Sequence, residues 1–148
     1  MQWVFLLMAV AAGCGIAMQP VINAELGRSL GHPVSAAMVS FAVGTLVLLI
    51  YVLVARLPLP TGARLSPVPW WILLAGGCLG AYFVSASTAL TPRLGVTVFV
   101  MTVVAGQLAM AMVLDHFGWL SLAERPVSAG RIAGLALVVA GIYLTRRF

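Results

Sequence analysis

The sequence predicts an all-α membrane protein with five transmembrane helices. Of its 148 residues, 63% are hydrophobic and only 7% are charged, and the mean hydropathy is +1.14. So few charges cannot cover the surface of a water-soluble domain of this size. No segment alternates as a membrane β-strand does, and a backbone in hydrocarbon must satisfy its own hydrogen bonds. Helices are therefore expected throughout.

Each predicted span is an apolar run of about 20 residues, the length that crosses a hydrocarbon core of about 30 Å. The segments between the runs, "GRSLGHP", "RLPLPTGARLSPVP" and "TPRLG", carry the Gly, Pro and Arg residues that end helices. We therefore expect one transmembrane domain, residues 1–148, with spans at about 3–22, 34–55, 70–90, 94–114 and 126–145.

The fifth span is the least regular, because only residues 132–145 are free of charge. About 14 residues are too few to span a bilayer. We expect this helix to begin near Pro126, a favoured first helical residue, with the Arg131 side chain extending toward the headgroups.

Arginine is divided evenly between the two sides of a five-span protein. One side carries Arg56, Arg64, Arg125 and Arg131, and the other carries Arg28, Arg93, Arg146 and Arg147. The positive-inside rule orients a membrane protein by an excess of Arg and Lys on its cytoplasmic loops, and here neither side has an excess. The balance is either an accident of a short chain or a sign of dual topology, in which copies insert both ways. Two such copies packed antiparallel form a ten-helix bundle of inverted repeats.

Five stretches, taken in order, carry a resemblance to a known family. They read "GCGIAMQPVINAELG", "SFAVGTLVL", "GGCLGAYFV", "GQLAMAMVLDHFG" and "GRIAGLALVVAGIYL". This series resembles the small YdcZ-type proteins of the drug/metabolite transporter (DMT) superfamily. The resemblance implies a five-helix half-transporter. It implies one of three assemblies, namely an antiparallel, dual-topology homodimer, a pair of gene products with opposed orientations, or a fused ten-helix form, and it implies no particular substrate. We expect a multi-pass protein of the bacterial cytoplasmic (inner) membrane.

Gln19 and Asn23 are the first candidates for a substrate-binding site. They are four residues apart, so a continuous helix places both amides on one face. Pro20 between them lacks an N–H group and is expected to kink the helix. The alternative is that these amides hold helices together, as Gln and Asn often do in bilayers.

Further polar candidates lie in the later spans. Gln107 lies deep in the fourth span, where a polar group is costly unless it faces the bundle interior or a cavity. Tyr82 and Ser85 share a face of the third span, and Ser40 lies in the second. The alternative for such hydroxyls is a hydrogen bond to their own helix.

The acidic residues Glu25, Asp115 and Glu124 all lie away from the predicted helix centres. This argues against proton-coupled export of cations, because an amide such as Gln19 cannot titrate. Glu25, with Arg28 nearby, and Asp115 are instead candidates for boundary or gating charges.

Gly130, Gly134 and Gly141 share one face of the fifth span, where small residues permit close helix contact. This face is our candidate dimer interface, and packing within one subunit is the alternative.

The favoured function is secondary transport or facilitated movement of small molecules by alternating access in the antiparallel dimer. The alternatives are a dual-topology channel and a non-transporting helper subunit. No spacing of His, Cys, Asp or Glu predicts a catalytic or metal site, so we expect no enzyme activity, metal or cofactor. The scattered charges do not predict nucleic-acid binding. The expected partners are the lipid bilayer, a second copy of the chain and a small-molecule substrate whose identity the sequence does not specify.

Overall fold

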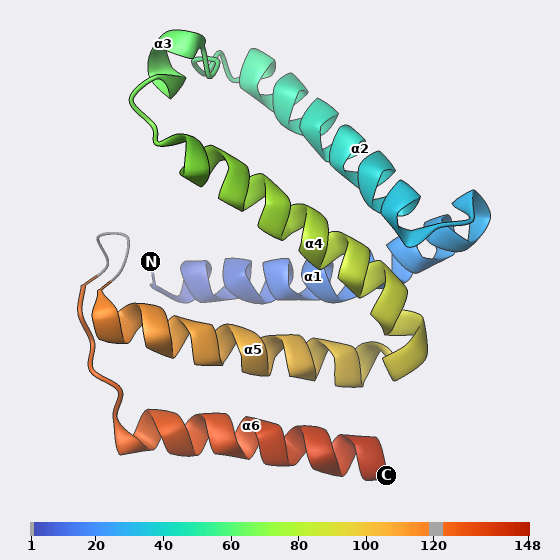
Figure 1. Ribbon diagram of the computed structural model, residues 1–148, viewed down its shortest axis with the longest axis vertical. Coiled ribbons are helices and arrows are strands. Elements are labelled where there is room, and N and C mark those ends of the chain that lie inside the picture. The colour runs from blue at the N-terminus through green and yellow to red at the C-terminus, as the bar shows by residue number, and fades with distance from the viewer. Residues whose placement is uncertain (1, 119–122) are drawn as a thin grey trace. The chain divides into compact units, whose positions relative to one another are not determined.

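A computed structural model describes residues 2–118 and 123–148. Its helices in these ranges are α1 (Gln2–Leu30), α2 (Pro33–Val54), α3 (Gly62–Leu65), α4 (Trp70–Leu94), α5 (Val96–Phe117) and α6 (Ala129–Arg147) (Figure 1). Of the described helices, all but the four-residue α3 are long and apolar enough to cross a membrane. The expected all-helical, five-span architecture is confirmed, whereas the dimer and the dual topology stay predictions.

The first helix is longer than the sequence suggests. It continues through Pro20 and eight residues past the expected end at residue 22. The chain turns at Gly31, whose φ of 79° is a conformation that favours glycine. The side chain of His32 then caps α2 by accepting a hydrogen bond from the Val34 N–H group at 3.2 Å. The turn at Gly31 and His32 therefore ends α1, whereas the polar residues from Gln19 to Glu25 do not. The predicted kink at Pro20 stays a prediction.

The other helix ends also follow local backbone chemistry. α4 continues through Pro92 to Leu94, four residues beyond the expected end, and Gly95, with a φ of 79°, separates it from α5. α6 begins at Ala129 and not at Pro126, because the Ser128 side chain caps the helix by accepting a hydrogen bond from the Arg131 N–H group at 3.3 Å.

The chain divides into two compact units, Met1–Arg93 and Leu94–Phe148. The first contains α1 to α4 and is called here the α1–α4 unit; the second is the α5–α6 unit. Each is described by itself, and the expectation of a single domain stays a prediction.

In the α1–α4 unit, the second half of α1, the first half of α2 and the second half of α4 meet at one end (Figure 1). We call this contact the three-helix junction. Its buried residues are Pro20, Asn23, Ala24, Gly27, Ala36, Ala37, Val84, Ser87, Thr88 and Thr91. Most are small, which allows the helix backbones to approach closely. The approach is tightest at Gly27, where an added Cβ would lie 3.3 Å from Thr88 Cγ2 and 3.5 Å from Pro33 Cα.

In the α5–α6 unit, the two helices run side by side (Figure 1). Gly141 marks a close contact, since an added Cβ there would lie 3.4 Å from the Met101 Cε atom of α5. No residue of α6 is buried. Large apolar side chains such as Leu137 and Val139 are exposed, as expected of a helix whose surroundings are lipid or another subunit.

Candidate functional site

A cavity of about 250 Å³ lies beside the three-helix junction, between α1, α2 and α4. The residues that line it are Gln19, Ser40, Phe41, Gly44, Thr45, Leu48 and Val84. We call it the Gln19 cavity. Its walls combine one amide and two hydroxyl groups with apolar side chains and carry no charge. Such a lining suits a small molecule with a few hydrogen-bonding groups on an apolar frame.

Asn23 lies one helical turn beyond Gln19 and is only 3% exposed. The Ser40 hydroxyl donates a hydrogen bond to Asn23 Oδ1 at 2.5 Å, which connects α2 to α1. The amide Nδ2 of Asn23 is buried and has no hydrogen-bond partner among the described residues. A buried donor without a partner costs free energy. Asn23 therefore orients Ser40, which lines the Gln19 cavity, and does not itself line that cavity.

The remaining polar candidates are dispersed. Tyr82 is 74% exposed and Ser85 is half-buried, while Val84 is the residue through which α4 lines the Gln19 cavity. Gln107 is exposed on α5, in the other unit. Thus Gln19 and Ser40 line one cavity, whereas the roles predicted for Tyr82, Ser85 and Gln107 stay predictions.

Glu25 and Arg28 form an exposed ion pair within α1. Both lie in the part of the helix that extends beyond the expected span. Their exposed ion pair is compatible with charges at the membrane boundary. Both the boundary role and the gating role stay predictions.

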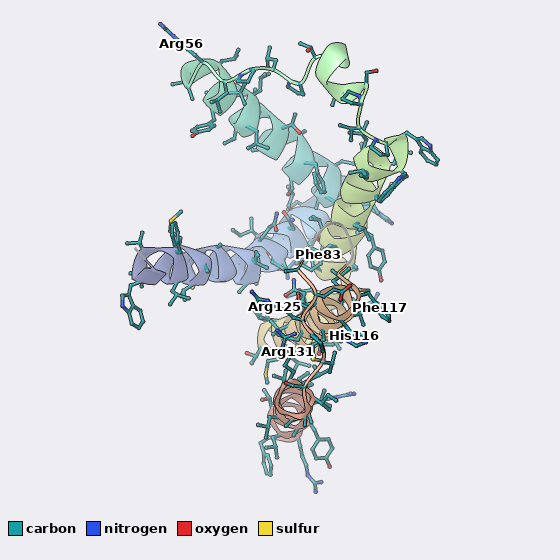
Figure 2. All side chains as sticks on the ribbon, turned by 90° about the vertical axis from the view of Figure 1, so that its left-hand side faces the viewer. Arg56, Phe83, His116, Phe117, Arg125 and Arg131 are labelled. Atoms are coloured by element: carbon teal, nitrogen blue, oxygen red, sulfur yellow. The ribbon has the colours of Figure 1, made fainter. Side chains whose placement is uncertain are left out.

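A second group of polar residues connects α5 to the segment before α6. Arg131 Nη1 donates to Asp115 Oδ2 at 3.1 Å, and the Arg125 N–H group donates to the Asp115 carbonyl at 2.7 Å. Beside them, the Val127 N–H group donates to His116 Nδ1 at 3.4 Å. Figure 2 shows His116, Arg125 and Arg131 gathered at this end of the α5–α6 unit. Residues 125–127 are thereby held against the end of α5.

The Asp115–Arg131 ion pair borders a cavity of about 310 Å³ between α5 and α6, whose other lining residues are Leu108, Ala111, Met112, Gly134 and Leu135. Gly134 therefore faces α5 within the subunit, and Gly141 on the same helix face contacts Met101. The geometry favours packing within one chain at Gly141 only, because an added Cβ at Gly134 would meet no atom within 4 Å. The dimer interface predicted at Gly130, Gly134 and Gly141 stays a prediction.

Sequence reasoning missed the partner of Asp115 and the three-helix junction. The sequence predicts only that Arg131 lies near the headgroups, because its proximity to Asp115 depends on how α5 packs against α6. A signal for the junction was available. Ala24 and Gly27 precede the Gly31 turn and Ala36 and Ala37 follow it, so small residues face each other across a tight helical hairpin.

Among residues 2–118 and 123–148, no group of three or more His, Cys, Asp or Glu side chains lies close enough together to hold a metal ion.

Replacing Asp115 by asparagine is expected to destabilise the protein by about 0.5–1 kcal/mol. The two side chains of the pair are 34% and 35% exposed, so solvent screens much of their attraction. The expected loss corresponds to about 2–3 °C in the melting temperature measured in detergent. Glu124→Gln is the matched control. Glu124 lies between α5 and α6, and its exposed carboxylate has no ion-pair partner among the described residues. Equal melting temperatures for Asp115→Asn and the control would show that the pair contributes nothing.

Five helices long and apolar enough to cross a membrane, in the described part of the chain, define a multi-pass membrane protein. Residues 4–144 match the model of the family described as "Putative inner membrane exporter, YdcZ". The chain belongs to this family, as its sequence motifs predict.

A curated relative, "Inner membrane protein YdcZ" of Escherichia coli strain K12, is 29% identical over 147 residues. The aligned region covers 99% of this chain and 97% of the relative. No solved structure matches the chain. The expected location is confirmed: this is a multi-pass inner-membrane protein.

Proposed function

We propose that the protein exports a small uncharged molecule across the inner membrane, and that the Gln19 cavity is its binding site. The observation that carries this proposal is a cavity, bounded by three apolar helices, whose lining offers hydrogen bonds and no charge. The direction of transport rests on the description of the family as an exporter.

The chemistry of the Gln19 cavity supports an uncharged substrate. The Gln19 amide both donates and accepts hydrogen bonds, and the Ser40 and Thr45 hydroxyls can do the same. A charged substrate taken into hydrocarbon needs an opposite charge, which this cavity does not offer. Phe41, Leu48 and Val84 supply the apolar part of the surface.

The working unit that we propose is an antiparallel homodimer. Five spans place the termini on opposite sides, so an inverted second copy supplies the repeat that many transporters contain within one chain. The balance of four arginines on each side permits both orientations. Alternating access then exchanges two equivalent conformations as the subunits rock, with Gln107 of α5 as a further predicted lining residue.

Transport by reconstituted protein tests the binding site. Liposomes are loaded with a mixture of uncharged, zwitterionic and charged metabolites, and the loss of each is followed by mass spectrometry against protein-free liposomes. We expect saturable loss of at least one uncharged solute and a rate about tenfold lower for Gln19→Leu, because about one strong hydrogen bond is removed. Met18→Leu, an exposed neighbour that does not line the cavity, is expected to keep the rate. Equal rates for Gln19→Leu and Met18→Leu would remove Gln19 from the site.

The dimer is tested in the same assay with orientation variants. Three lysines added at the C-terminus and three added at the N-terminus should force opposite orientations. Each variant alone is expected to lose transport, and the two together should regain it. Full transport by either variant alone would contradict the antiparallel dimer, and single-channel currents in place of saturable transport would favour a channel.

A further inference from the structure

A second cavity of the α1–α4 unit lies at the turn between α1 and α2, beside the end of α4. Its volume is about 280 Å³, slightly below the range typical of pockets for drug-sized ligands. The lining residues are Ala24, Gly27, Arg28, Gly31, Pro33, Thr88, Ala89, Pro92 and Arg93. We call it the arginine cavity. It shares no lining residue with the Gln19 cavity.

The arginine cavity has a surplus of positive charge. Arg93 is exposed and forms no ion pair with any carboxylate in the described part of the chain. Arg28 is paired with Glu25, and both side chains are largely exposed, so water screens their attraction. Two arginines against one glutamate leave a net charge of about +1 at the cavity. The small residues around them leave space for a group that this charge attracts.

The cavity lies at the level of helix ends. α1 ends at Leu30, α2 begins at Pro33 and α4 ends at Leu94, and these ends surround it. Membrane helices reach the headgroup region at their ends, and basic pockets between such helices attract anionic headgroups. The planar guanidinium group forms paired hydrogen bonds with phosphate oxygens, which a single ammonium charge does not.

We propose that the arginine cavity binds a phosphate group between Arg28 and Arg93. The group comes either from the headgroup of an anionic phospholipid or from a soluble phosphate compound. This binding is separate from transport through the Gln19 cavity and stands or falls independently of it.

Ligand-dependent melting temperatures of the purified full chain in detergent test this proposal. One arm adds phosphatidylglycerol and compares it with phosphatidylcholine in equal mixed micelles. The other adds inorganic phosphate and compares it with chloride at equal ionic strength. A ligand that binds the folded protein raises its melting temperature. We expect at least one of the two phosphate sources to raise it by about 3 °C or more over its comparison.

Variants of the charged residues make the test specific. Arg93→Gln is expected to weaken the binding of that phosphate source about fivefold, from the contribution of one arginine near a phosphate-bearing surface. Glu25→Gln is expected to strengthen binding, because it removes the negative charge that competes for Arg28. Arg56→Gln is the control, since this arginine extends from the end of α2 away from the rest of its unit and lines neither cavity (Figure 2).

The variants also separate binding from a structural role of Arg93. An arginine in the last turn of a helix can simply interact with the helix dipole. In that case Arg93→Gln lowers the melting temperature without changing its response to either phosphate source, and the proposal is overturned. It is equally overturned if neither source stabilises the wild-type chain more than its comparison does. A response to phosphatidylglycerol alone identifies a lipid site, and a response to inorganic phosphate identifies a site for a soluble compound.

Discussion

Replacing Gly27 by leucine is expected to destabilise the α1–α4 unit by about 1–3 kcal/mol, the usual cost of inserting extra carbon atoms into a well-packed core. An added Cβ would lie 3.3 Å from Thr88 Cγ2, 3.5 Å from Pro33 Cα and 3.7 Å from Ala36 Cβ. Pro33 is the first residue of α2, so its Cα atom has little freedom to move aside. A leucine side chain must therefore separate α1 from α2 or from α4.

The measurement for Gly27→Leu is the yield of monodisperse protein by size-exclusion chromatography, together with the melting temperature in detergent. Gly27→Ala is expected to lie between the wild type and leucine, because a single methyl group requires a shift of only a few tenths of an ångström. Gly13→Leu is the matched control on the same helix, since an added Cβ there meets no other atom within 4 Å. Equal losses at Gly13 and Gly27 would mean that a general effect of replacing a glycine of α1 by leucine, and not contact at the junction, causes the loss.

Replacing Asn23 by leucine is expected to abolish most of the transport while leaving the protein about as stable as the wild type. Leucine has the same branched shape, and it removes the buried Nδ2 group that lacks a partner. Without Asn23, the Ser40 hydroxyl is expected to turn to a carbonyl of its own helix and leave the wall of the Gln19 cavity.

The variant Ser40→Ala separates the effect on stability from the effect on transport. It leaves both polar atoms of the buried Asn23 side chain without a partner and is expected to cost about 1 kcal/mol, within the range of hydrogen bonds between membrane helices. We expect the double variant Asn23→Leu with Ser40→Ala to regain this stability but to transport no better than Ser40→Ala. Additive losses of transport in the double variant would show that Asn23 acts independently of Ser40.

Composition and apolar run length predicted the existence and order of the spanning helices. A backbone in lipid must satisfy its own hydrogen bonds, and a helix does so within one segment. The ends of the helices were predicted less well. α1 has 29 residues, about 43 Å at 1.5 Å per residue, so it extends beyond a hydrocarbon core of about 30 Å. The polar residues from Gln19 to Glu25 indicated the limit of the apolar run, whereas the Gly31 turn sets the end of the helix.

The sequence names candidate site residues but does not place them in the fold, because helical spacing specifies which residues share a face and not which helix that face contacts. Gln19 and Asn23 were selected together as residues of one face, but one lines a cavity and the other is buried against α2. Which of them reaches the cavity depends on where α2 crosses α1, and that depends on small residues such as Gly27 and Ala36. Contacts of this kind lie far apart in the sequence and have no local signature.

The three-helix junction holds α1 near one end only. Its contacts with α2 and α4 gather near Asn23 and Gly27, whereas residues 3–16 of the same helix are exposed. Trp3 lies 20 positions before Asn23 in α1 and therefore about 30 Å from the junction. A rotation of about 10° at the junction, where the atoms move by less than their own radius, displaces Trp3 by about 5 Å. A small rotation around Asn23 and Ser40 would therefore produce a large displacement at the opposite end of α1.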